Sequence, residues 1–265
     1  MKQSASPSPD GTVHLELTGA VATIWFDRPK ARNAMTWAMY EAMADACKSI
    51  ASNGDARVAV LRGVGGKAFI AGTDIEQFSA FESGADGVDY EARIAGYVGA
   101  VAGLNIPTIA VVEGWAVGGG MAIASVCDFR IASTGARFGV PIARTLGNCL
   151  SAGNLNVLMA TLGMPIVKRM LLLAEMVPAE DLTAGGYVQE IAAPEQLDEV
   201  VDGYCNRLTS HAPVTMSVTK QTLARLLEAN GVSDHDLVSE AYGSQDFHEG
   251  VAAFVTKRKP SWSGR

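Results

Sequence analysis

Three consecutive glycines, Gly118 to Gly120, follow the apolar run "TIAVVEGWAV" and precede the small-residue stretch "MAIASV". Glycine loses more backbone freedom on folding than any other residue, so three together carry an entropic cost. An apolar strand that leads through glycine into a helix also brings backbone N–H groups to the helix start, where the dipole favours negative charge. The triplet therefore indicates an α/β fold in which something approaches this turn closely.

The first 200 residues show further strands that alternate with helical patterns. "TVHLELTGAVATIWFDRP" alternates apolar and polar residues around Gly19 and predicts a β-hairpin that ends at Pro29. The spacing of Met35, Met39, Met43, Cys47 and Ile50 predicts an amphipathic helix. "ARVAVLRG", "PTIAVVEG" and "CDFRIAS" predict buried strands, and "EARIAGYVGAVAGL" predicts a helix between the first two. This alternation is typical of parallel βαβ units.

From residue 152 onward nearly every segment has helical periodicity, with prolines at or near the helix starts. We expect a disordered N-terminus over residues 1–11, an α/β core over residues 12–200 and a helical region over residues 201–265.

Charge and cysteine content exclude several classes of protein. The net charge of −7 argues against general nucleic-acid binding, which needs basic patches. No apolar run is long enough to span a membrane and the first residues do not resemble a signal peptide, so we expect a cytoplasmic protein. The four cysteines lack metal-binding spacing, which indicates free thiols in a reducing compartment and no metal site.

A second glycine cluster, "RGVGGKAFIAGTDIEQF", formally fits a dinucleotide fingerprint, but no helix opens at its glycines. The turn Ala71-Gly72-Thr73 instead ends a loop and starts a helix, as the glycine triplet does. Two N–H groups directed at one oxygen would form an oxyanion hole. On spacing alone, both turns could equally be ordinary strand–helix connections.

Five segments together resemble the crotonase (enoyl-CoA hydratase/isomerase) superfamily in order and spacing, over about residues 12 to 265. The resemblance implies a ββα spiral core with a helical C-terminal trimerisation region. It also implies an acyl-CoA thioester as substrate and a homotrimer or a dimer of trimers. The five segments are "FDRPKARNAM", "GKAFIAGTDIEQF", "AVVEGWAVGGGMAIASVCDFRIAS", "ARFGVPIA" and "EGVAAFVTKRKPSWSGR".

The resemblance assigns the two oxyanion-hole amides to Thr73 and Gly119. Coenzyme A then enters as part of the substrate, with no permanently bound cofactor. The matched positions place Phe254 and Lys257 against coenzyme A from a neighbouring subunit, although Lys257 could equally be one charge of a basic tail. The other positions matched to coenzyme A contacts are Lys30, Ala31, Arg32, Ala71 and Thr73. Lys30 and Arg32 could instead be solvated charges after Pro29.

The sequence departs from the family where its hydratases carry two glutamates. Ala122 occupies the first position and Ile142 the second, with Ala143 as an alternative alignment. Neither side chain can accept a proton, so the two-glutamate hydration mechanism lacks its acids. Arg144 is a candidate for fixing an acyl carboxylate or polarising the thioester, and a structural salt bridge is the alternative.

Other polar residues near these positions are candidates to replace the two missing glutamates. Glu76, Glu82 or Asp86 could serve as the base, although a solvated face explains them equally well. Cys149 has no histidine near it in sequence and Ser151 fits a helix cap, so neither is expected to be a nucleophile. The histidines are expected at the surface or in caps: His14, His211, His235 and His248.

The resemblance favours an acyl-CoA enzyme of the enoyl-CoA hydratase/isomerase type. A decarboxylase, an isomerase or a thioester hydrolase would use the same oxyanion hole, and decarboxylation needs no general base. A non-catalytic acyl-CoA-binding or assembly protein is the alternative of a different class.

Overall fold

The computed structural model describes residues 11–229 and 232–265, so most of the N-terminal segment expected to be disordered lies outside the described residues. Its larger sheet has the strand order β1-β2-β3-β5-β7-β10. The β1–β2 hairpin is antiparallel and the other neighbours are parallel, which confirms the predicted hairpin and βαβ units. These strands are β1 (Thr12–Thr18), β2 (Val21–Asp27), β3 (Val58–Gly63), β5 (Thr108–Val112), β7 (Phe129–Ser133) and β10 (Glu190–Ala192).

A second sheet, β4-β6-β8-β9, was not predicted from the sequence. Each turn of the chain adds one strand to each sheet and then a helix, in the order β3-β4-α2, β5-β6-α3 and β7-β8-α4. This repeat is the expected ββα spiral. Its elements are β4 (Ala68–Ile70), β6 (Trp115–Val117), β8 (Arg137–Gly139), β9 (Val177–Pro178), α2 (Gly84–Ala102), α3 (Gly119–Val126) and α4 (Ile142–Thr145).

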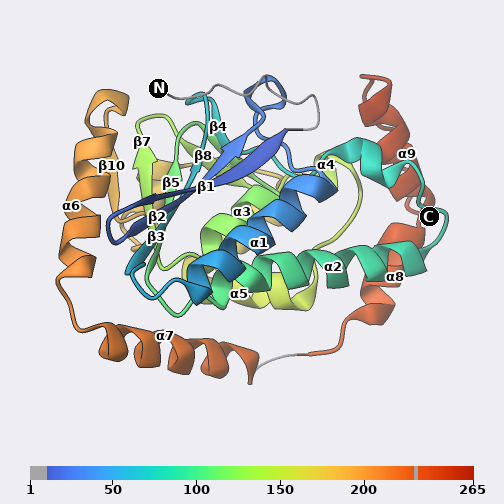
Figure 1. The fold of residues 1–265 in the computed structure, drawn as a ribbon. Coiled ribbons are helices and arrows are strands. Elements are labelled where there is room, and N and C mark those ends of the chain that lie inside the picture. The colour runs from blue at the N-terminus through green and yellow to red at the C-terminus, as the bar shows by residue number, and fades with distance from the viewer. Residues whose placement is uncertain (1–10, 230–231) are drawn as a thin grey trace.

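Helices α1 (Trp37–Ser52) and α5 (Ala152–Leu171) enclose the core with α2 and α3 (Figure 1). Thr36 caps α1 by accepting a hydrogen bond from the Met39 amide. Met39, Met43 and Cys47 are buried, as the three- and four-residue spacing predicts.

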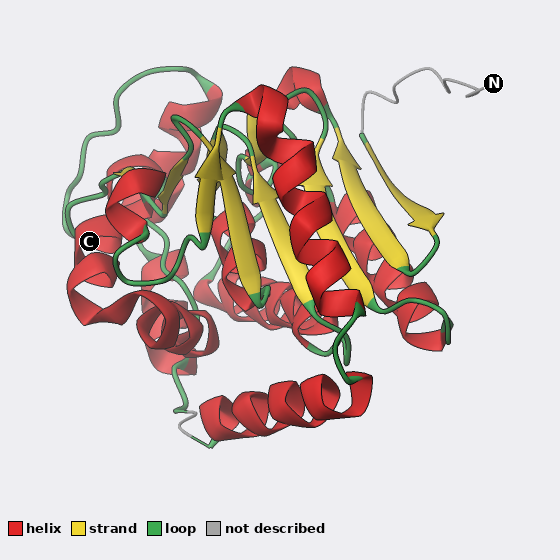
Figure 2. Cartoon of the chain, turned by 90° about the vertical axis from the view of Figure 1, so that its left-hand side faces the viewer, coloured by secondary structure: helices red, strands yellow, loops and turns green. Residues whose placement is uncertain are grey.

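Helix α6 (Leu197–Thr209) covers the outer face of the larger sheet (Figure 2). Leu197 and Val201 pack there with Val58, Val60 and Ile109. Residue 200, where we expected the α/β core to end, lies inside this helix, which packs on the sheet.

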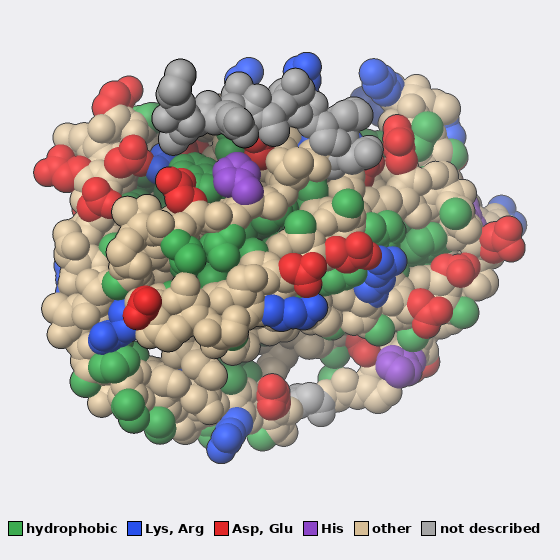
Figure 3. Space-filling model, viewed as in Figure 1, with side chains coloured by type: hydrophobic (Ala, Val, Ile, Leu, Met, Phe, Trp, Pro, Cys, Tyr) green, Lys and Arg blue, Asp and Glu red, His purple; other side chains and the backbone are tan. Residues whose placement is uncertain are grey.

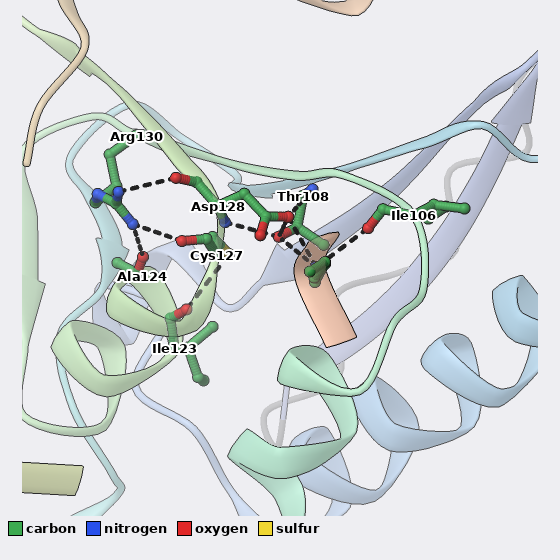
Figure 4. A network of polar contacts seen from close by, with 8 residues as sticks. Ile106, Thr108, Ile123, Ala124, Cys127, Asp128 and Arg130 are labelled. Carbon is green, nitrogen blue, oxygen red and sulfur yellow. Dashed lines mark hydrogen bonds and ion pairs between the residues drawn. The ribbon is translucent and has the colours of Figure 1, made fainter. Parts of the chain in front are cut away.

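Helix α7 (Pro213–Glu228) runs apart from both sheets along the lower edge of the molecule in Figure 1. The Lys220 ammonium group joins it to the core, donating to Asp128 at 2.8 Å and to the Ile106 carbonyl at 3.1 Å. Asp128 also accepts from the Thr108 amide (Figure 4). No helix in the described residues is long and apolar enough to cross a bilayer.

The last helices, α8 (His235–Gly243) and α9 (Gln245–Val255), return over α2 and α4 of the same chain (Figure 1). Gly87 makes the close approach of α2 and α8 possible, because a Cβ there would lie 2.1 Å from the Tyr242 ring. Tyr242 and Phe247 pack with Phe78 and Tyr90 in a buried aromatic cluster. The C-terminal helices therefore complete the core around this cluster.

Candidate active site

The two glycine turns recognised in the sequence lie side by side. A Cβ added to Gly118 would be 3.8 Å from the Gly72 Cα, and one added to Gly72 would be 3.6 Å from the Val117 carbonyl oxygen. Both residues have positive φ, +109° at Gly72 and +53° at Gly118, which favours glycine. Two segments about 45 residues apart in sequence thus form one backbone surface.

The amide N–H groups of Thr73 and Gly119 are available at this surface. Met35 forms a parallel bridge with Thr73 through the Gly72 carbonyl and the Asp74 amide, at 2.8 and 2.9 Å, so the Thr73 amide faces the other way. Gly119 is the first residue of α3. Within residues 11–229 and 232–265, neither amide has a hydrogen-bond acceptor. Both residues line the same cavity, where their N–H groups can bind an oxyanion.

The packing of the protein explains why three glycines are needed here despite their entropic cost. A Cβ on Gly119 would lie 2.5 Å from the Tyr40 hydroxyl, and one on Gly120 would lie 2.1 Å from the Ile70 carbonyl oxygen. The close approach expected at this turn is therefore made by the chain itself at Gly119 and Gly120. Gly119 and Gly120 let α3 dock against the chain itself, and Gly118 supplies the positive φ before the helix.

A buried hydroxyl chain holds Thr73 in place. The Thr73 hydroxyl lies 2.9 Å from the hydroxyl of Tyr40 and 2.9 Å from that of Tyr90. Burial raises the pKa of Tyr40 to about 12 and the pKa of Tyr90 well above its usual value, so both phenols stay protonated. This chain fixes the residue whose amide faces the cavity.

The cavity has a volume of about 160 Å³. An apolar cavity of about this size holds one benzene molecule, so the space suits a short acyl chain. Ala122 and Ile142 both line it, whereas Ala143 is exposed outside it. Of the two candidates for the second glutamate position, only Ile142 faces the cavity, so Ala122 and Ile142 present methyl and butyl groups to it.

Glu91 supplies the only carboxyl group among the residues that line this cavity in the described chain. It is 5% exposed, accepts from the Tyr242 hydroxyl at 2.8 Å, and accepts from the Ser151 amide at 2.9 Å. Burial raises the pKa of Glu91, and these hydrogen bonds partly oppose that shift. We did not predict this residue from the sequence. Its one signal is its position on the stripe formed by Ile94 and Val98, the buried face of α2.

The acids and the cation proposed from the sequence lie elsewhere. Glu76 and Glu82 are exposed. Asp86 forms the capping box of α2, and the amides of Glu82 and Ser83 lower its pKa. None of the three lines the cavity, which agrees with the interpretation that they belong to a solvated face. Arg144 lies in α4 between two lining residues, but its side chain is exposed and does not line the cavity.

The remaining candidates have structural positions. Burial raises the pKa of the Cys149 thiol to about 12, so it is not a nucleophile at neutral pH. Ser151 precedes α5 as its N-cap residue, in agreement with the sequence prediction, although its hydroxyl makes no capping bond. All four histidines are exposed. The described residues contain no group of side chains that could hold a metal ion.

The segment expected to contact coenzyme A lies beside the turn Ala71-Gly72-Thr73. The Ala71 amide donates to the Arg32 carbonyl at 3.1 Å, and the side chains of Lys30 and Arg32 are exposed there, with Ala31 partly buried. Phe254 lines the cavity of its own chain because α9 returns over the core. Whether Phe254 also reaches the site of a neighbouring subunit stays a prediction from the resemblance.

Comparison with known proteins agrees with this geometry. A family model described as enoyl-CoA hydratase/isomerase matches residues 16–265. The chain belongs to this family. The short-chain-enoyl-CoA hydratase of Clostridium acetobutylicum is 32% identical over 256 residues, which cover 93% of this chain and 95% of that protein. The (E)-benzylidenesuccinyl-CoA hydratase of Thauera aromatica is 30% identical and covers 95% and 99%.

Solved structures of family members show the same fold. A methylmalonyl-CoA decarboxylase bound to 2-nitronate-propionyl-CoA superposes with a TM-score of 0.87 at 25% identity, covering 96% of this chain and 99% of that one. An enoyl-CoA hydratase/carnithine racemase from Magnetospirillum magneticum has a TM-score of 0.78 at 29% identity and covers 96% of both chains. The resemblance recognised in the sequence is confirmed.

Proposed function

We propose that this protein binds a short acyl-CoA thioester and stabilises its enolate with the amides of Thr73 and Gly119. The observation that carries the proposal is the pair of unoccupied N–H groups at one cavity in an acyl-CoA enzyme of the enoyl-CoA hydratase/isomerase family. A negative oxygen between them would also face the N-terminus of α3, where the helix dipole favours it.

The reaction we favour is proton transfer at the carbon next to the thioester, as in double-bond isomerisation. Hydration by two glutamates requires carboxyls to hold and deprotonate the water, and Ala122 and Ile142 provide none. A single carboxyl in the cavity is sufficient to move one proton between two carbons.

Decarboxylation is the second candidate. The superposition on a methylmalonyl-CoA decarboxylase, with a TM-score of 0.87, is its specific support. Loss of carbon dioxide generates the same enolate without a base, so the missing glutamates would not prevent it.

The residues around the cavity support a binding mode for coenzyme A. Lys30 and Arg32 lie beside the Ala71 turn, where their charges would meet phosphates, and Ala31, Ala71 and Thr73 would also contact coenzyme A. Phe254 and Lys257 at the end of α9 would approach it from the other side. We expect no permanently bound cofactor.

We also infer a homotrimer or a dimer of trimers, built through α7, in the cytoplasm. Helix α7 carries Val214, Val218 and Leu223, which are 72%, 57% and 58% exposed. Hydrophobic side chains are visible over its first turns at the lower left of Figure 3. A helix that exposes several large apolar side chains is typical of a subunit interface.

A panel of thioesters tests the reaction class. Crotonyl-CoA, a 3-enoyl-CoA and methylmalonyl-CoA report hydration, isomerisation and decarboxylation respectively. We expect turnover of the 3-enoyl-CoA, with a four- to six-carbon chain preferred over an eight-carbon chain. Turnover of methylmalonyl-CoA alone would favour the second candidate, and hydration of crotonyl-CoA at an ordinary enzymatic rate would overturn the proposed reaction.

Two matched double variants test the oxyanion hole. In a Tyr40→Phe background, which removes the hydroxyl 2.5 Å from a Cβ at residue 119, Gly119→Ala keeps the amide N–H and Gly119→Pro removes it. Proline is tolerated at the first helical position, so both variants should fold. We expect the proline variant to be about 100-fold slower than the alanine variant, because one donor contributes roughly 3 kcal/mol. Equal rates would contradict the assignment.

A further inference from the structure

Glu91 separates the acyl cavity from a second hollow. On one side it lines the cavity with Thr73 and Gly119. On the other side it lines a hollow of about 190 Å³ together with Asp234 and His235. The side chains of Ala92, Ala95 and His235 in this hollow are exposed, so it lies at the surface. Glu91 is therefore a carboxyl group between a closed acyl site and water.

Three elements hold this carboxyl group in a fixed position. Glu91 itself is on α2, Tyr242 on α8 donates to one oxygen, and the Ser151 amide before α5 donates to the other. Tyr242 in turn accepts from the Asn148 side-chain amide at 3.0 Å. A carboxylate oxygen can accept two hydrogen bonds, so each oxygen has one acceptor position not used by these two donors.

We propose that Glu91 is the proton-transfer residue of the acyl site, with Tyr242 and Asn148 as its positioning residues. The C–H bond next to the thioester carbonyl breaks and its proton forms an O–H bond with the Glu91 carboxylate. The electron pair moves through the new carbon–carbon double bond onto the thioester oxygen, which accepts from the amides of Thr73 and Gly119. Return of the proton to carbon reverses the step.

The hollow beside Asp234 and His235 gives this proton a route to solvent. Exchange there would replace the proton on Glu91 with one from water before it returns to carbon. The proposal rests on the proposed function, because it requires a thioester in the cavity. It goes further by naming the group that substitutes for the two absent glutamates.

The surroundings of Glu91 determine the pH at which it acts. The titratable groups that face Glu91 come from four elements. Tyr242 and His235 lie on α8 with Asp234 as its N-cap, Tyr90 lies on α2, Tyr40 on α1, and Cys149 in the loop before α5. Burial and the charge of Asp234 raise the pKa of Glu91, while the donors from Tyr242 and Ser151 lower it. The carboxylate form therefore becomes predominant at a pH above the ordinary carboxyl pKa of 4.5, and proton abstraction should increase with pH through the raised pKa.

Deuterium exchange tests the proposal directly. Butyryl-CoA is incubated with the protein in D₂O, and mass spectrometry follows deuterium incorporation at the carbon next to the thioester. We expect exchange by the wild type and a loss of at least 100-fold in Glu91→Gln, since general acid–base groups contribute 10²- to 10⁴-fold. Glu76→Gln removes an exposed glutamate outside the cavity and should exchange at the wild-type rate.

Two further variants keep the test decisive if Glu91→Gln folds poorly. Glu91→Asp retains the carboxyl on a shorter stem and should recover part of the exchange. Tyr242→Phe removes one donor to the carboxylate and should shift the acidic limb of the pH–rate profile to higher pH. A residue that only supported the fold would lower the rate without moving that limb.

The outcomes separate the two proposals. Exchange by Glu91→Gln at the wild-type rate would overturn the role of Glu91 and leave the proposed function intact. Calorimetry with butyryl-CoA tests whether the wild type binds the thioester at all. No binding of the thioester by the wild type would overturn the proposed function, and binding without any exchange would overturn the proton transfer.

Discussion

At the scale of single residues, the account depends on the carboxyl group of Glu91, which is 5% exposed and lines the same cavity as Thr73 and Gly119. The glycine turns and the family resemblance led directly to Thr73 and Gly119, because glycine and its position are visible in the sequence. Glu91 was missed because one glutamate within a helix ordinarily faces water. Its burial depends on Tyr242 and Ser151, which approach from segments 60 to 151 residues away.

Because its pKa is raised, Glu91 should make the free energy of unfolding depend on pH. Between the ordinary carboxyl value of 4.5 and the raised value, the folded chain keeps a proton that the unfolded chain has released. The contribution of Glu91 to stability is thus present at low pH and decreases as pH rises across this window. In Glu91→Gln this dependence is absent, so the variant should gain stability relative to the wild type as pH rises.

Urea unfolding of both proteins at a series of pH values from 4 to 8 measures this difference. Glu76→Gln, which removes an exposed glutamate outside the cavity, is unfolded in parallel as the control for the loss of one carboxyl group. A constant difference between Glu91→Gln and the wild type over the whole range would show that Glu91 titrates normally.

At the scale of secondary-structure elements, α3 is fixed at both ends. Its N-terminus provides Gly119, and at its C-terminus the buried Arg130 donates to the carbonyls of Ala124 and Cys127 at 3.1 and 2.6 Å (Figure 4). Arg130 also donates to the Asp128 carbonyl. A cation at this end complements the helix dipole and satisfies carbonyls that would otherwise lack donors.

We therefore expect Arg130→Met to lower the free energy of unfolding by about 3 kcal/mol or more, because several buried carbonyls lose their donor. Arg137→Met is the control: Arg137 is exposed, and its replacement should cost about 0.5 kcal/mol or less. Chemical denaturation measures both. A loss in Arg130→Met no larger than in the control would contradict this role.

The length of a helix or strand decided whether it could be predicted from the sequence. Helix α1 and the strands β3, β5 and β7 were predicted because their apolar patterns extend over five or more residues. The strands β4, β6 and β8 have three residues each, too few to show a period of two. The second sheet therefore became visible only in three dimensions.

At the scale of the whole molecule, the C-terminal half has two different roles. Helices α8 and α9 return over α2 and α4, and Phe254 of α9 lines the candidate cavity, whereas α7 projects away from the sheets (Figure 1). The sequence predicted helices throughout this region but placed the domain boundary inside α6. Which helices cover the cavity depends on contacts such as that of Gly87 with Tyr242, which join distant segments and have no local signature.

The exposed face of α7 predicts a change of assembly on substitution. Leu223→Glu places a charge on this face and should dissociate the oligomer, which light scattering on a sizing column would detect as a lower mass. Leu17→Glu, at an exposed apolar position on the β1 strand, is the matched control and should leave the mass unchanged. An unchanged mass in Leu223→Glu would place the subunit interface elsewhere.

The central claim is that this molecule binds the enolate of an acyl-CoA more tightly than the thioester itself. The most direct measurement compares, by calorimetry, the affinity of a nitronate analogue of a short acyl-CoA with that of the neutral acyl-CoA of equal length. We predict that the nitronate binds at least 100-fold more tightly, and that Gly119→Pro in the Tyr40→Phe background loses most of this difference. Equal affinities for the two ligands would contradict the account.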